Sequence, residues 1–178
     1  VLDLLFFIQG SALDGLFAVS ITLMLAENTS LANAAIGGGV LLALRHVGEA
    51  LAAPLFGSLG DRFGAIKIFT MSAALTVVGL LLIAFNQVIS GAIILLIFRG
   101  AIASLGPTII AQQFGDTETV LDNLARLQSW RDIGAAAGPM VTGFALVYIS
   151  AEIQHLVLAI IFGVVLVLSG PKITTNSN

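Results

Sequence analysis

The sequence has little charge and no cysteine. Of its 178 residues, 58% are hydrophobic and only 10% are charged, whereas a soluble domain is about 25% charged. The lack of cysteine excludes disulfides, thiolate nucleophiles and Cys-based zinc or iron–sulfur sites. The two histidines, His46 and His155, stand far apart in the chain, so we expect no metal site and no cofactor. The net charge of −3 offers nothing to a phosphate backbone, which excludes a nucleic-acid partner.

The apolar residues occur in six long runs, and the mean hydropathy is +1.07. A bilayer core is about 30 Å thick, and a helix needs about 20 apolar residues to cross it. The runs lack the alternation of membrane β-strands, and helices satisfy their own backbone hydrogen bonds in lipid. We therefore predict an all-α integral membrane protein with a six-helix transmembrane bundle over residues 1–172 and a polar C-terminal tail over 173–178. The predicted helices are residues 4–25, 34–57, 66–85, 88–111, 126–148 and 153–168.

The basic residues indicate how the bundle is oriented. Connections on one side of the predicted bundle carry basic residues, whereas the opposite connections carry no Lys or Arg. The basic residues are Arg62, Lys67, Arg126, Arg131 and Lys172. Since basic residues favour the cytoplasmic side, we predict a multi-pass protein of the cell membrane (plasma or inner) with both termini in the cytoplasm. Apolar residues at helical spacing over 119–130 predict an amphipathic cytoplasmic segment that leads into the fifth helix.

Charged residues near the middle of three predicted helices form the candidate functional site. One lies in the first helix, two in the second and one in the fourth: Asp14, Arg45, Glu49 and Arg99. An ionised group at mid-bilayer costs roughly 2.5–3.5 kcal/mol, so these three helices should border a polar space. The third and sixth helices should then form a lipid-facing wall. We interpret the four residues as a substrate and ion pathway.

Each of these residues also has a structural interpretation. Arg45 and Glu49 are four positions apart and can neutralise each other on one helix face. Asp14 can be a static partner of Arg45 or of Arg99, and Arg99 can belong to a purely structural ion pair. His46, which points about 100° away from Arg45, is expected to pack against a neighbouring helix.

Asp14 and Arg99 also occupy matching positions in the first and fourth helices. Each lies near mid-helix and is followed by a glycine, Gly15 or Gly100. Because the two helices are three apart, the matching positions run in opposite directions through the membrane, which is the arrangement of a 3+3 inverted repeat.

The end of the second predicted helix contains a motif. Residues 57–67 read GSLGDRFGAIK, which resembles the G-xxx-D-[RK]-x-G-x-[RK]-[RK] loop of the major facilitator superfamily. The matching positions are Gly57, Asp61, Arg62, Gly64 and Lys67, and Ile66 replaces one basic residue. Gly64 allows a tight turn between helices, and Asp61 can pair with a basic group or cap a helix N-terminus.

A second motif lies in the fifth predicted helix. Residues 134–143 read GAAAGPMVTG, which is similar to the superfamily segment G-xxx-GP-xx-GG. The matching positions are Gly134, Gly138, Pro139 and Gly143, and Thr142 replaces a glycine. Glycines at this spacing let helices approach closely in lipid, and proline softens the helix. In the superfamily this segment is associated with antiporters.

The resemblance implies one six-helix half of a twelve-helix secondary transporter, with the 3+3 inverted repeat of that fold. A small solute would bind near mid-membrane between the two halves, which rock to expose it to each side in turn. The implied partners are this solute, the proton and the other six-helix half. Asp61 and Arg62 would latch the cytoplasmic gate, while Glu49, with Asp14, is the candidate for proton coupling. The short polar tail and the absence of an initiator Met favour the C-terminal half, although the antiporter segment belongs to the N-terminal half.

Two other classes of protein remain open. One is a membrane protein that shares the fold but does not transport, such as a receptor or an assembly subunit. The other is an intramembrane enzyme, for which Asp14 and His46 are the only candidate polar residues and no nucleophile accompanies them. We predict that the protein is not an enzyme and has no catalytic residues.

Overall fold

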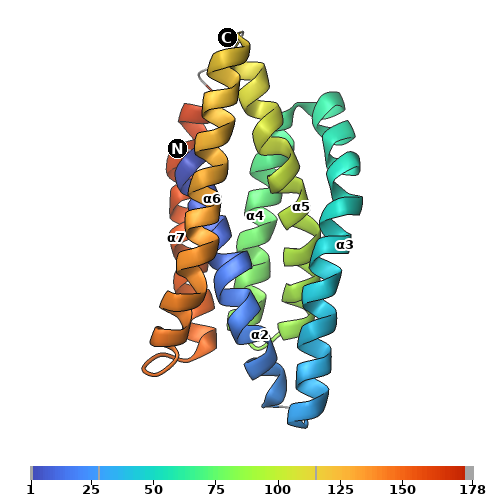
Figure 1. The fold of residues 1–178 in the computed structure, drawn as a ribbon, viewed down its shortest axis with the longest axis vertical. Helices are drawn as coiled ribbons and strands as arrows, with labels where there is room; N and C mark the ends of the chain where they lie inside the picture. Colours follow the sequence, from blue (N-terminus) through green and yellow to red (C-terminus); the bar gives the residue numbers. More distant parts are fainter. Residues whose placement is uncertain (1, 28, 115, 175–178) are drawn as a thin grey trace.

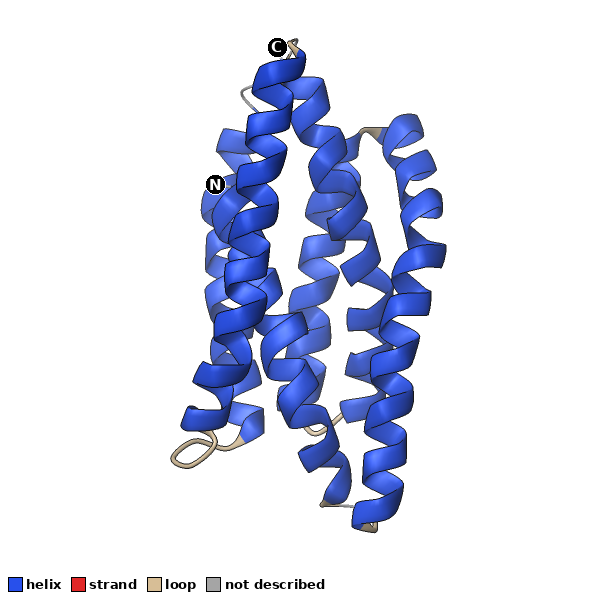
Figure 2. Ribbon diagram, viewed as in Figure 1, coloured by secondary structure: helices blue, strands red, loops and turns tan. Residues whose placement is uncertain are grey.

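The computed structural model describes residues 2–27, 29–114 and 116–174. This part of the chain consists of helices joined by short turns and contains no strand (Figures 1 and 2). The elements are α1 (Leu2–Gln9), η1 (Gly10–Leu16), α2 (Phe17–Ala26), α3 (Leu31–Phe63), α4 (Ala65–Ala84), α5 (Val88–Gln113), α6 (Thr117–Ala145) and α7 (Ala151–Thr174). Because α1, η1 and α2 are continuous, the elements form six helical rods, and the predicted all-α six-helix bundle is confirmed.

Five of the rods are long and apolar enough to cross a membrane: α1–η1–α2, α3, α4, α5 and α7. The sixth, α6, begins at Thr117, ahead of the predicted start at residue 126, and carries Glu118 in its first turn. The Asp116 carboxylate starts this helix by accepting a hydrogen bond from the Thr119 N–H at 2.8 Å. The segment 119–130, predicted as a lead-in, is therefore the first part of α6 itself. Its Trp130 meets Phe7 of α1 edge to face.

The connections are sorted between the two ends of the bundle. The α3–α4 and α5–α6 connections lie at one end, and the other three lie at the opposite end (Figure 1). Gly64 alone joins α3 to α4 with a φ of +95°, a conformation that residues with a side chain rarely adopt. Arg126 and Arg131 lie inside α6 instead of in a loop. The C-terminal residues 175–178 of the predicted tail lie outside the described residues.

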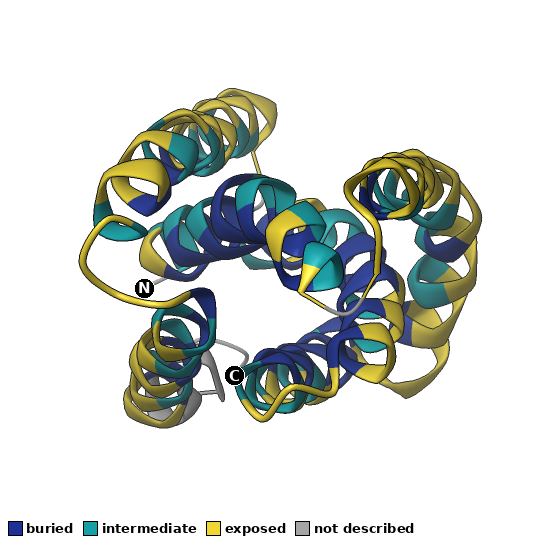
Figure 3. Cartoon of the chain, turned by 90° about the horizontal axis from the view of Figure 1, so that it is seen from below, coloured by how far each residue is buried: buried dark blue, intermediate teal, exposed yellow. Residues whose placement is uncertain are grey.

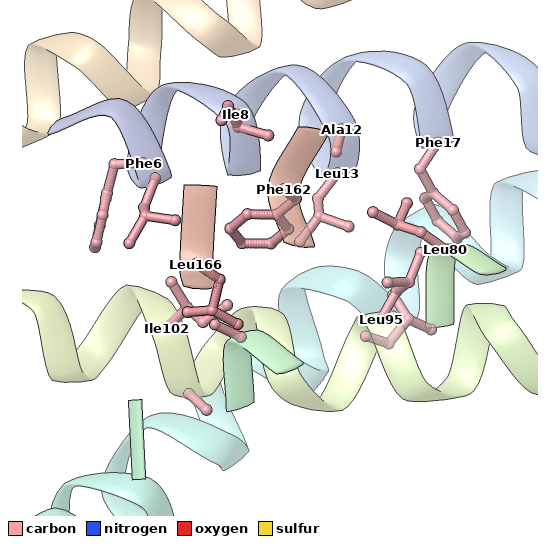
Figure 4. Close-up of a cluster of buried hydrophobic side chains, with 14 of the residues drawn as sticks. Phe6, Ile8, Ala12, Leu13, Phe17, Leu80, Leu95, Ile102, Phe162 and Leu166 are labelled. Atoms are coloured by element: carbon pink, nitrogen blue, oxygen red, sulfur yellow. The ribbon is translucent and has the colours of Figure 1, made fainter. Parts of the chain in front are cut away.

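The first rod runs through the centre of the bundle (Figure 3). Several of its apolar side chains, among them Phe6, Leu13 and Phe17, are buried in one core cluster with Leu80, Leu95 and Phe162 of the surrounding helices (Figure 4). The rings of Phe6 and Phe69 stack with their centroids 6.3 Å apart. In lipid such side chains gain mainly through close packing and dispersion, because the acyl chains outside are equally apolar.

The third predicted helix, α4, presents Met71 and Val78 on an exposed apolar face, as expected of an outer wall. Helix α4 packs against α3, α5 and α7, whereas α3 is the least buried rod and presents Leu44, Val47 and Leu51 to the outside. His46 is exposed on α3, so its expected packing against a neighbouring helix is wrong. The reason is that α3 contacts the bundle along one face only, and that face carries Arg45 and Glu49.

Candidate functional site

The four mid-helix charged residues meet at one place, which we call the ion cluster: Asp14, Arg45, Glu49 and Arg99. The Asp14 carboxylate lies 2.8 Å from Arg99 Nη2 and 3.0 Å from Arg45 Nη1. A third ion pair joins the Arg99 guanidinium to Glu49. The structure thus brings together η1, α3 and α5, the three rods in which the charges lie.

The pairing within the ion cluster crosses between helices. Within the described residues, Arg45 pairs with Asp14 and Glu49 pairs with Arg99, so Arg45 and Glu49 do not neutralise each other on their own helix. Two carboxylates and two guanidinium groups give a net charge of zero. The Arg99 side chain is 7% exposed and that of Glu49 is 28% exposed. A buried cluster of this kind persists because each charge has a partner, and losing one partner leaves another charge uncompensated.

Asp14 lies in a π-helical segment. In η1 the helix is wider than an α-helix, and the Phe17 N–H bonds back to the Ala12 carbonyl. Arg45 Nη1 also lies 3.4 Å from the Leu13 carbonyl, to which it donates. Arg45 therefore contacts both the Asp14 side chain and the main chain just before it. Single π-helical turns occur frequently at functional sites, where they redirect a side chain.

Gly15 follows Asp14 and Gly100 follows Arg99, and each of these glycines lets a neighbouring helix approach closely. A Cβ on Gly15 would lie 2.5 Å from the Gly138 Cα in α6. A Cβ on Gly100 would lie 2.9 Å from the Ala52 Cβ and 3.1 Å from the Glu49 Cα in α3. The contact at Gly100 brings α3 close enough to α5 for Glu49 to reach the arginine that precedes this glycine.

Two polar residues that the sequence did not single out make contacts in the structure. Gln9 is 2% exposed, and its Nε2 donates to the Arg99 main-chain carbonyl at 3.4 Å. The sequence could have indicated Gln9, because it is a polar amide within an apolar run and lies shortly before Asp14. Asp3 of α1 pairs with Arg126 of α6 at 3.1 Å, which ties these two rods together near one end.

The loop motif lies apart from the ion cluster. Asp61, Arg62, Gly64 and Lys67 are exposed at the end of the bundle where α3 meets α4. Asp61 takes part in no ion pair within the described residues, and α4 begins without a side-chain cap, so neither expected contact of Asp61 is present. The Arg62 guanidinium instead lies over the Phe63 ring, 5.9 Å from its centroid.

The Gly-Pro motif of α6 divides into a packed part and an open part. A Cβ on Gly134 would collide with the Phe7 main chain, and one on Gly138 would lie 2.7 Å from the Gly15 Cα. Helix α6 continues through Pro139. A Cβ on Gly143 would meet nothing within 4 Å, so this glycine serves no close contact in the bundle.

The described residues contain no group of three or more His, Asp or Glu side chains that could hold a metal ion. The fold and the cluster define a multi-pass helical membrane protein with paired charges in its interior. The model of the Major Facilitator Superfamily matches residues 4–175. The chain therefore belongs to this superfamily, whose members are transporters, and the resemblance drawn from the two motifs is confirmed. Comparisons with curated proteins and with solved structures gave no match.

Proposed function

We propose that the protein is a secondary active transporter that moves a small solute by alternating access, and that the ion cluster belongs to its substrate and ion pathway. The observation that carries this proposal is the meeting of Asp14, Arg45, Glu49 and Arg99 from three separate rods. Charged groups inside a membrane are costly, and those that persist mark ion or substrate pathways as a rule. The membership of the transporter superfamily supports the same conclusion.

We infer that Glu49 exchanges the coupling proton. Its side chain is the most exposed of the cluster, and it has one partner, Arg99, whereas Asp14 has two. A proton on Glu49 would give the cluster a net charge of +1 and release one side of Arg99. Asp14 would meanwhile keep η1, α3 and α5 together. Exchange of this proton for a solute is antiport, in keeping with the Gly-Pro motif of α6.

The partner in this proposal is a second six-helix half. Helices α3 and α6 expose apolar side chains, among them Leu55 and Phe144, and Gly143 has open space around it. A facing half would cover these surfaces and place the ion cluster between the two bundles. The basic residues near one end of the bundle support placing that end, with both termini, in the cytoplasm of a cell-membrane protein. Asp61 and Arg62 would then contact the other half at the cytoplasmic gate.

The test is proton-coupled uptake in reconstituted vesicles. A pH-sensitive dye inside the vesicles reports proton movement when candidate solutes are added, and uptake of each labelled solute is measured with and without a pH gradient. We expect Glu49→Gln to remove the pH dependence of uptake. Glu27→Gln, the same change at an exposed site at the end of α2, should leave it unchanged. Unchanged pH dependence in Glu49→Gln would exclude Glu49 from coupling, and the absence of solute uptake by the wild type would refute transport.

A further inference from the structure

A second feature of the bundle is a cavity of about 380 Å³ between α1–η1, α6 and α7. Its inner wall includes Ile8 and Thr142, each 4% exposed. Its rim includes Val141 and Val157, which are 61% and 47% exposed. The cavity is therefore a crevice that opens on the outer surface of the bundle. No residue of the ion cluster lines it.

The crevice exists because α6 and α7, although consecutive, pack on different neighbours. Helix α6 packs against α1 and η1, whereas α7 packs mainly against α4. The side of α6 that lines the crevice carries the small residues Ala137, Gly138 and Ala145. Short side chains at these positions leave the space between the two helices unfilled.

The chemistry of the lining fits a hydrocarbon. Among the described residues the lining contains no charged side chain, and its polar side chains are Ser11, Thr142 and Gln154. Gln154 Nε2 already donates to the Ile149 carbonyl at 3.0 Å. A polar solute would find too few hydrogen-bond partners here, and apolar cavities do not hold ordered water. A void of this size would also forfeit the dispersion contacts of its walls.

We propose that this crevice binds one acyl chain of a membrane phospholipid. The exposed rim residues Val157 and Ile161 lie on α7, which is long and apolar enough to cross a membrane, and this places the opening against the hydrocarbon of the bilayer. Ile149 and Gln154 mark the end of the crevice at the α6–α7 connection, where the headgroup would lie. From there the acyl chain runs between α6 and α7 towards Ile8. The volume of the crevice, about 380 Å³, is within the range of ordinary ligand pockets.

The experiment compares phospholipid retention by variants that fill the crevice. Purified protein is delipidated in detergent, incubated with phosphatidylcholine, phosphatidylethanolamine or phosphatidylglycerol of identical chains, and examined by native mass spectrometry. We expect the wild type to retain one phospholipid with any of the three headgroups, and Ala137→Leu and Ala145→Leu to lose it. The matched control is Ala136→Leu, the same change one residue away at an exposed position of α6. It should retain the lipid.

Two outcomes of the retention experiment would overturn the proposal. One is equal retention by Ala137→Leu and Ala136→Leu, and the other is retention that depends on a single headgroup. Circular dichroism checks that the variants fold. If they do not fold, a spin-labelled phospholipid tests the proposal on the wild type alone. A phospholipid with a spin label near the end of one chain should show an immobilised component in reconstituted protein. A freely moving label, or displacement of the lipid by a transported solute, would also refute acyl-chain binding.

Discussion

Replacing Asp14 by asparagine tests whether the ion cluster holds three rods together. The Asp14 carboxylate contacts Arg45 at 3.0 Å and Arg99 at 2.8 Å, and its side chain is 13% exposed. The change removes both ionic contacts and leaves a cluster with a net charge of +1. Removing one partner of a buried ion pair costs about 3–5 kcal/mol, so we expect Asp14→Asn to lower the free energy of unfolding by about that amount.

The other carboxylate provides an internal comparison. Glu49 has one ionic partner and is more exposed than Asp14, so Glu49→Gln should cost about 1.5–3 kcal/mol, the range for a hydrogen bond to a charged group. The double variant Asp14→Asn/Arg45→Gln returns the cluster to neutrality. It should therefore recover part of the stability that Asp14→Asn alone has lost.

The measurement is reversible unfolding of the purified protein in mixed micelles, followed by circular dichroism, for the wild type and the three variants. A loss below about 1 kcal/mol in Asp14→Asn would mean that the cluster behaves like an exposed ion pair, which contradicts its burial. The reasoning would also fail if Glu49→Gln were the more damaging single change, since that order reverses the number of partners each carboxylate has.

Two further predictions concern α6. Gly134→Leu should lower the free energy of unfolding by about 1–3 kcal/mol, because the new side chain collides with the Phe7 main chain. Gly143→Leu should be close to neutral in the same unfolding assay, because the space around this glycine is open. Equal effects of the two variants would contradict the contact between α1 and α6. The hydrogen bond from the Thr119 N–H holds the pKa of Asp116 below its ordinary value of 3.8. Its stabilisation of the start of α6 should therefore be complete above pH 3.8 and be lost as the pH falls through the lower folded pKa. The helix content measured by circular dichroism as a function of pH checks this loss. The same dependence on pH in Asp116→Asn would refute the role of the Asp116 carboxylate.

The sequence predicted much of the fold and the composition of the candidate site. Hydropathy located the helices because burial of apolar side chains and backbone hydrogen bonding in lipid act along each segment by itself. The cost of charge at mid-membrane predicted that the helices carrying Asp14, Glu49 and Arg99 border one polar space, and in the structure these three side chains are joined by ion pairs. The same reasoning placed α4 in an outer wall, and α4 presents Met71 and Val78 to the outside while its other faces pack against α3, α5 and α7.

The pairing within the site could not be read from spacing. The i, i+4 relation of Arg45 and Glu49 suggested one ion pair on α3, but each residue has a nearer partner on another rod. Which partner is nearer depends on the rotation of each helix about its axis and on the depth at which the helices cross. Neither quantity is encoded in a local pattern.

The amino-acid sequence by itself therefore determined a helical membrane bundle, the rods that carry charge, and the two motifs that indicate the superfamily. Only the tertiary structure decided that Asp14 serves two arginines, that η1 is π-helical, and that a crevice separates α6 from α7. The physical reason is one of range. Hydropathy and helix formation depend on residues a few positions apart, whereas these features depend on close approaches such as Gly15 to Gly138, between residues distant in the chain.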